Sequence, residues 1–147
     1  GTDSLVPGTI YKFKYRARNS YGPGDYSDEV DAGVSSFPTQ PSPPAQVIAE
    51  SGETYITLSW SASADTEMPV LGYLLNIDDG YGGSKTVVYN GFNHPNVLQY
   101  TVTGLLTSLT YTFTLQALNY NGASDESNEV SFIICVTPSG FAAPTLS

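Results

Sequence analysis

The fold is decided by one stretch of sequence that the chain contains twice. It reads LLTSLTYTFTLQALNYNGASDES at residues 105–127 and LVPGTIYKFKYRARNSYGPGDYS at residues 5–27. The two copies align without a gap at an offset of 100 residues, which is 111 − 11 for Tyr111 and Tyr11. A period near one hundred residues is too long for a solenoid repeat and suits a whole small domain. The 147 residues are therefore expected to hold about one and a half domains.

Apolar and polar residues alternate along short runs of the chain, which predicts half-buried β-strands. In residues 55–60, YITLSW, the alternation turns Trp60 inward and leaves Thr57 facing outward. Turn-forming pairs such as Asn121-Gly122 separate the runs. Strands are expected at about residues 45–50, 54–61, 71–78, 84–89, 97–103, 109–118 and 128–136, and in the first copy at about 9–18 and 28–36. Seven short strands with such turns predict an all-β sandwich.

The repeat divides the chain into four segments. Residues 1–37 are expected to be the last two strands of a preceding domain, 38–44 a Pro-rich linker, 45–137 a complete domain, and 138–147 a linker and the start of a following domain. The linker prolines favour an extended, semi-rigid chain, although they would equally block pairing at an edge strand. Two lone strands cannot bury a face. The first segment is thus expected to be completed by preceding residues of the same protein or by another chain through strand addition.

The two copies resemble the fibronectin type III family. The family pattern has a proline-led first strand, a tryptophan closing the second, Gly-Tyr on the third, a Leu followed six residues later by a Tyr, and an Asn-x-x-Gly turn before a Ser. The second copy matches it at Pro44, Trp60, Gly72, Tyr73, Leu105, Tyr111, Asn119, Gly122 and Ser127, and the first at Leu5, Tyr11, Asn19, Gly22 and Ser27. The resemblance covers almost the whole chain and implies tandem immunoglobulin-like sandwiches of seven strands each.

The resemblance and the strand pattern together assign structural roles rather than chemical ones. Core positions are expected at Trp60, Tyr73, Leu105, Tyr111 and Phe113, and at Tyr11 and Phe13 in the first copy. Tyr111 and Tyr11 are placed like a tyrosine corner, whose hydroxyl bonds the backbone a few residues upstream. Neither hairpin loop contains Arg-Gly-Asp, so the integrin-type adhesion of some relatives does not carry over. No Asn-x-Ser/Thr sequence is present, and N-glycosylation of this segment is not expected.

Residues that could carry catalysis or bind a metal are scarce. The chain has one histidine, His94, and one cysteine, Cys135, so the sequence supports neither a nucleophile–base pair nor a zinc site. His94 is expected in an exposed loop. Cys135 aligns with Ser35 and is expected to be a partly buried thiol. The acidic pairs lack the spacing of a calcium loop. We therefore predict no catalytic residue, no metal and no cofactor.

Charge is distributed unevenly between the two copies and points to protein partners. The net charge is −9, of which residues 1–43 carry −1 and residues 44–147 carry −8, a balance that disfavours nucleic acid. In the first copy Lys12, Lys14, Arg16 and Arg18 share one strand face, which the second copy fills with Thr112, Thr114, Gln116 and Leu118. Either the acid-rich second unit or a neighbouring chain could balance this basic face, or acids on adjacent strands could do so.

Tyrosines in loops provide further candidate contacts for proteins or glycans, because their rings give a large contact area with a polar tip. With the basic face, the candidate partner-contact residues are Lys12, Lys14, Arg16, Arg18, Tyr21, Tyr26 and Tyr120. The sequence contains no run of eighteen apolar residues, the length needed to span a membrane.

The sequence as a whole predicts a non-catalytic structural or adhesive module of a longer tandem-repeat protein. It would be extracellular or at the cell surface, in a fibrous assembly, and would contact other repeats or copies of itself. Two alternatives stay open: an accessory module of a large secreted, carbohydrate-active enzyme, and an intracellular scaffold array.

Overall fold

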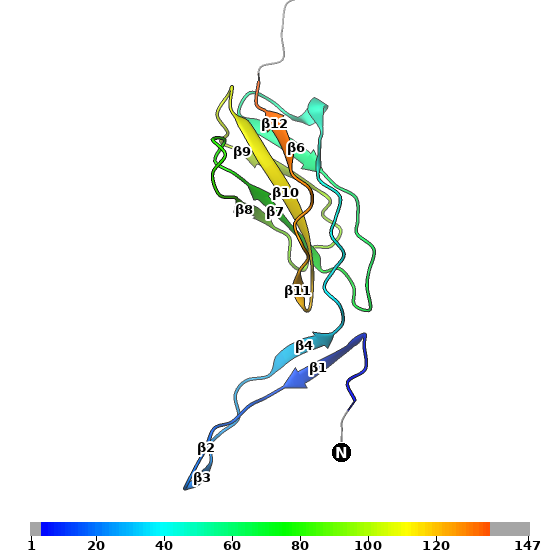
Figure 1. Cartoon of the computed structure of the whole chain (residues 1–147), viewed down its shortest axis with the longest axis vertical. Coiled ribbons are helices and arrows are strands. Elements are labelled where there is room, and N and C mark those ends of the chain that lie inside the picture. The colour runs from blue at the N-terminus through cyan, green and yellow to red at the C-terminus, as the bar shows by residue number, and fades with distance from the viewer. Residues whose placement is uncertain (1–3, 136–147) are drawn as a thin grey trace, which may run out of the picture.

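The computed structural model describes residues 4–135 of the chain as two groups of strands (Figure 1). The first group is a long hairpin at one end of the molecule, containing strands β1 to β4. The second group, β5 to β12, forms a sandwich of two sheets with one short 3-10 helix, η1 (Ile48–Glu50). The regular secondary structure of the described residues is therefore almost entirely β-strand, as the alternating pattern predicts.

In the first group β1 (Thr9–Phe13) pairs antiparallel with β4 (Val30–Val34), and β2 (Arg18–Asn19) pairs with β3 (Gly22–Pro23). The prediction of one continuous strand at 9–18 is wrong, because β1 ends at Phe13. The matching strand of the second group runs unbroken from Thr110 to Asn119, since a neighbouring strand pairs along its other edge. In the described residues β1 has no such neighbour.

The sandwich has the seven expected strands and one short addition. One sheet has the order β5-β6-β9, and the other β11-β10-β7-β8 with β12 also paired to β10. Their bounds are β5 Ala45–Gln46, β6 Tyr55–Ser59, β7 Gly72–Ile77, β8 Thr86–Asn90, β9 Gln99–Thr103, β10 Thr110–Asn119, β11 Gly122–Ala123 and β12 Val130–Ile133. The first and last strands are shorter than predicted, because η1 follows β5 closely and the regular pairing of β12 stops at Ile133.

The core lies between these two sheets. The side chains of Trp60, Tyr73, Leu105, Tyr111 and Phe113 are all buried there. The rings of Trp60 and Tyr73 lie 6.0 Å apart between centroids. Burial of such large rings is the main stabilising contribution in a domain of this size.

Two threonines expected on the outer faces are buried instead. The Thr57 hydroxyl donates to the Glu50 carbonyl at 2.6 Å, and the Thr114 hydroxyl donates to the Glu126 carboxylate at 2.8 Å. Neighbouring polar side chains cover them, and their hydrogen bonds offset the loss of water contacts. Period-two alternation identifies the face on which a residue lies but not what covers that face.

Hydrogen bonds at the tyrosine corner recur 100 residues apart. The Tyr111 hydroxyl accepts the Leu106 N–H at 3.1 Å, and the Tyr11 hydroxyl accepts the Val6 N–H at 2.9 Å. Ser127 and Ser27 repeat the same relation, each accepting a backbone N–H twelve residues upstream. The two copies therefore share local backbone structure as well as sequence.

The first group has no covered core. Phe13 is 48% exposed, whereas its counterpart Phe113 is fully buried, and Tyr11 is only half-buried. The prediction of a core position for Phe13 therefore does not hold in this chain. The reason is that no second sheet packs on β1 and β4 within residues 4–135.

Candidate functional site

The two lysines of the basic strand face are paired with acids on the adjacent strand segment. The Lys12 ammonium lies 3.1 Å from the Asp31 carboxylate, directly across the β1–β4 ladder, and 3.5 Å from Glu29. Lys14 lies 3.1 Å from Glu29. Asp31 and then Glu29 raise the pKa of Lys12. Of the alternatives that the sequence leaves open, acids on the adjacent strand segment are the ones that pair with both lysines.

The two arginines belong to a different part of the hairpin. The Arg16 guanidinium lies 4.6 Å from the centre of the Tyr26 ring, a cation–π contact. Arg18, in β2, has no acid within ion-pair distance among residues 4–135. Tyr21, which follows β2 at the tip, is 99% exposed. We call Arg16, Arg18, Tyr21 and Tyr26 the hairpin patch, since these candidate contact residues all lie along one exposed hairpin.

Tyr120 lies elsewhere, where the two groups of strands meet. A Cβ built on Gly33 of β4 would lie 2.9 Å from the Tyr120 Cβ and 2.9 Å from the Met68 Cε. Met68 is buried, although it belongs to a loop of the sandwich. The predicted contact residues are therefore divided among the ion-paired Lys12 and Lys14, the hairpin patch, and this meeting point of the two groups, which we call the joint.

Polar contacts fix the joint in the segment that follows Gly33. The Asn119 side-chain amide donates to the Ser36 carbonyl at 2.9 Å, and the Asn121 amide donates to the Ser35 carbonyl. The Ser36 N–H donates to the Glu67 carboxylate at 3.0 Å. A further bond links Gln40, in the Pro-rich segment, to the Glu126 carbonyl. The segment between the groups is thus bonded to the sandwich as well as extended.

Two glycines of the first group let the joint close. Gly8 has a φ of +82°, and a Cβ there would lie 3.1 Å from the Glu67 carbonyl oxygen. Gly33 faces Met68 and Tyr120 as described above. Their counterparts 100 residues later are Ser108 and Ile133, which carry side chains. Sequence reasoning missed the joint, yet the signal was present where the two copies differ.

Residues 42–133 match the domain-family model described as Fibronectin type III domain. The chain belongs to the fibronectin type III family. The match covers all of the strands of the sandwich, and its two-sheet architecture is the family's immunoglobulin-like fold.

Curated relatives carry fibronectin type III domains in much longer proteins. The chain is 34% identical over 136 residues to human Fibronectin type-III domain-containing protein 3A, covering 89% of this chain and 11% of that protein. It is 30% identical over 122 residues to chicken Receptor-type tyrosine-protein phosphatase eta, covering 82% of this chain and 8% of the relative. The chain thus spans about a tenth of the length of these relatives.

Solved fibronectin type III structures superpose on the chain. The 6th such domain of human fibronectin type III domain containing protein 3 has a TM-score of 0.59 and 27% identity, covering 74% of this chain and 95% of that one. The chicken CNTN1 FN1-FN3 domains have a TM-score of 0.58 and 20% identity, covering 90% of this chain and 45% of that one, a likeness of fold alone.

The residues of this fibronectin type III chain that could take part in catalysis or metal binding stabilise turns or are exposed to solvent. Within residues 4–135 no group of three or more His, Cys, Asp or Glu residues could hold a metal ion. The Asp79 carboxylate accepts the N–H groups of Tyr81 and Gly83, and these bonds, Tyr81 first, lower the pKa of Asp79. His94 is exposed, as expected. The family is generally non-catalytic.

Cys135 is exposed rather than partly buried. Alternation along the last strand explains the difference, because Ile134 takes the inward position and its neighbour cannot. No helix in the described part of the chain is long and apolar enough to cross a membrane.

Acidic pH is expected to weaken the joint, because protonation of Glu67 weakens its hydrogen bond with the Ser36 N–H. The Ser36 N–H lowers the pKa of the Glu67 carboxyl, so this contribution is present above the ordinary glutamate value and is lost as pH falls through the lowered pKa. The amide shift of Ser36, followed by NMR from neutral to acid pH, should change in that window. Glu67→Gln should abolish the change and Glu53→Gln should leave it. A titration that persists in Glu67→Gln would contradict the assignment.

Proposed function

We propose that the chain is a non-catalytic structural module of a longer tandem-repeat protein. It acts as a spacer that holds neighbouring fibronectin type III units in a defined relation and contacts other proteins through its exposed surfaces. Residues 1–37 end a preceding unit, 38–44 connect the units, 45–137 form a complete unit, and 138–147 lead into a following one.

The joint is the observation that carries this proposal. A flexible linker would leave the two groups free to move, whereas here both asparagine side chains and the Glu67 carboxylate bond the backbone of Ser35 and Ser36. These bonds and the close approach of Gly33 to Met68 hold the two groups at several points, which restricts rotation as well as separation. Such a joint suits a protein that transmits force or sets a distance between partners.

The repeat itself supports the tandem arrangement. The tyrosine-corner and serine hydrogen bonds occur at the same positions in both copies, so the first group has the local structure of the end of a sandwich. Its apolar face, including the half-exposed Phe13, fits the remaining strands of such a unit. The exposed face is the structural reason to place more of the same fold before it.

Protein partners of the module are expected at the hairpin patch. Arg16 and Tyr26 are held together by their cation–π contact, which lowers the entropy cost of binding. Tyr21 adds an almost fully exposed ring at the tip. We place the protein outside the cell or at its surface, in keeping with the receptor-type phosphatase among its relatives.

Mass spectrometry of the intact native polypeptide, with peptide sequencing, tests the proposal. The expected result is a mass several times the 15.7 kDa of this chain and further fibronectin type III repeats around it. A catalytic domain in the same polypeptide would favour the accessory-module alternative. A native mass of 15.7 kDa would overturn the tandem proposal, and the apolar face of the first group would then need a second chain to cover it.

A further inference from the structure

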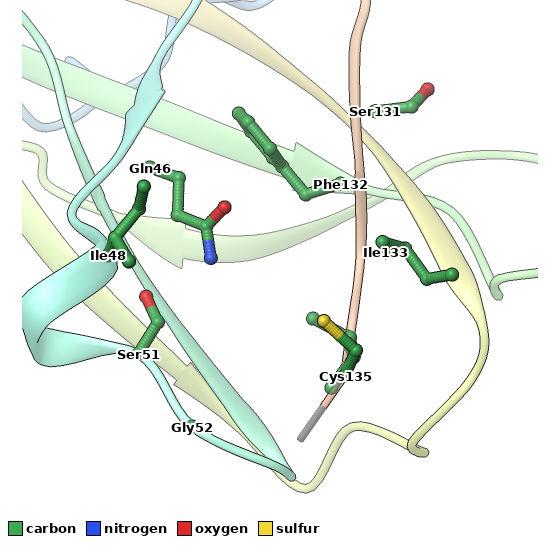
Figure 2. Close-up of a pocket in the computed structure, with 9 residues that line it drawn as sticks. Gln46, Ile48, Ser51, Gly52, Ser131, Phe132, Ile133 and Cys135 are labelled. Atoms are coloured by element: carbon green, nitrogen blue, oxygen red, sulfur yellow. The ribbon is translucent and has the colours of Figure 1, made fainter. Parts of the chain in front are cut away.

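An open groove runs beside the last strand of the sandwich, far from the joint (Figures 1 and 2). Its volume is about 390 Å³, within the range of sites that hold ligands. One bank is formed by β5 and η1 with the turn after it, where Gln46, Ile48 and Gly52 lie. The other bank is β12 and Cys135. Figure 2 shows the Phe132 ring and the Cys135 thiol facing this gap, with Ser131 and Ile133 turned the other way.

Among residues 4–135, backbone groups of β12 that face this groove have no hydrogen-bond partner. Ile134 donates its N–H to the Leu109 carbonyl at 2.9 Å, and β12 pairs only with β10 among the described strands. Hydrogen bonding in an antiparallel pair alternates from residue to residue. The N–H and C=O groups of Ser131 and Ile133 therefore point to the open edge.

The matching strand of the first copy protects its edge and β12 does not. Natural edge strands avoid unwanted pairing by carrying charges or irregular residues. In β4 these are Asp31, ion-paired with Lys12, and Gly33. The same positions of β12 hold Ser131 and Ile133, and Ile133 is 57% exposed. The second copy has thus lost both protective residues.

Charge around the groove selects the occupant. Exposed Glu50 and Glu53 flank one bank in sequence, and Glu129 precedes the other. Lys85, the single Lys or Arg of residues 44–147, lies 2.6 Å from Glu129 and balances that acid, so Glu50 and Glu53 carry the unbalanced negative charge at the groove. The sandwich of a second copy, in residues 44–147 with a net charge of −8, would be repelled. A segment with lysine or arginine at its ends would be attracted.

We propose that the edge of β12 accepts an extended strand from another protein, with apolar side chains at alternate positions and basic residues at its ends. Backbone bonds to Ser131 and Ile133 would add the segment to the sheet, and its apolar side chains would enter the groove against Phe132. This inference gives the module a specific binding edge and does not depend on the tandem arrangement.

Binding of a fluorescein-labelled peptide, KKVTVTVKK, tests the inference by anisotropy in a Cys135→Ser chain, which has the residue found at position 35 and cannot form disulfides. We expect saturable binding and at least about tenfold slower exchange of the Ser131 and Ile133 amides. The peptide EEVTVTVEE should bind at least about tenfold more weakly. No binding of the basic peptide at millimolar concentration would overturn the proposal.

Two variants separate edge pairing from non-specific attraction. Ile133→Pro removes an N–H that faces the groove and leaves the β10 ladder intact, so affinity should fall at least about tenfold. Ile133→Gly, which copies Gly33, should weaken binding less, because the backbone donor remains. Near-UV circular dichroism checks that both variants fold. Undiminished binding by folded Ile133→Pro, amides already protected without peptide, or a peptide-free dimer in sedimentation would each refute strand addition from a partner.

Discussion

Gly72→Ala is expected to destabilise the sandwich by about 4 kcal/mol or more, which few single substitutions do. Gly72 begins β7 with a φ of +152°, and a Cβ there would lie 1.9 Å from the carbonyl oxygen and 2.6 Å from the carbonyl carbon of Gly91. Both atoms belong to the backbone, so no side chain can rotate away. Gly91 is itself held by its N–H bond to the Tyr73 carbonyl. The two segments must therefore separate to admit a methyl group.

Gly82→Ala is the matched control for this prediction. Gly82 also has a positive φ, +80°, but nothing lies within 4 Å of its Cβ position. Gly82→Ala should lower the free energy of unfolding by about 1–2 kcal/mol, the cost of the left-handed conformation alone. Urea unfolding followed by the fluorescence of Trp60 measures both values. Equal losses would show that the contact with Gly91 is unimportant.

Gly33→Ile is expected to open the joint. The substitution installs the residue that the second copy has at position 133, and its Cβ would lie 2.9 Å from both Met68 and Tyr120. The sandwich should stay folded, because its core lies between its own two sheets and contains neither Gly33 nor Met68. The Ser36 amide, which bonds Glu67, should exchange at least about tenfold faster. The side-chain amide signals of Asn119 and Asn121 should shift as well.

Two further variants show whether the steric contact is the cause. Gly24→Ala lies outside the joint, with its Cβ at an ordinary 3.5 Å from the Ala17 carbonyl oxygen, and should leave these signals unchanged. Met68→Ala in the Gly33→Ile background removes one of the clashing side chains and should restore part of the protection. If Gly33→Ile leaves the Ser36 amide unaffected, the joint does not depend on close packing at Gly33.

Most of the sandwich could be predicted from the sequence because its core follows a period of two. Trp60 and Phe113 are inward on that pattern, and both are buried. Tyr111 was assigned its hydroxyl bond from the resemblance, and the bond is present. Thr57 was misassigned because the hydroxyl partners that make its burial tolerable come from outside its own strand. Local pattern cannot show contacts of that kind.

The candidate site was harder to predict, since it depends on pairing and on how the two groups meet. The acids that balance Lys12 are adjacent only once β1 and β4 are aligned residue by residue. The joint requires the position of Met68 relative to Gly33, which no single strand encodes. Even so, the alignment of the two copies shows that Gly33 corresponds to Ile133. That difference marks the two positions in the sequence, but the contact with Met68 that makes Gly33 part of the joint depends on the fold.

We propose that residues 5–36 are the end of a fibronectin type III unit. Placing residues 44–104 directly before Leu5 tests it, because these residues supply the strands that precede Leu105 in the second copy. We predict that amide exchange in β1 and β4 slows by at least about a hundredfold relative to the original chain, as Phe13 becomes covered. A second version carries Tyr15→Leu, which gives position 15 the residue of the aligned core position Leu115. It tests whether the larger tyrosine side chain prevents the new core from packing. Exchange as fast as in the original chain in both versions, with the sandwich of residues 45–135 still folded, would contradict the claim.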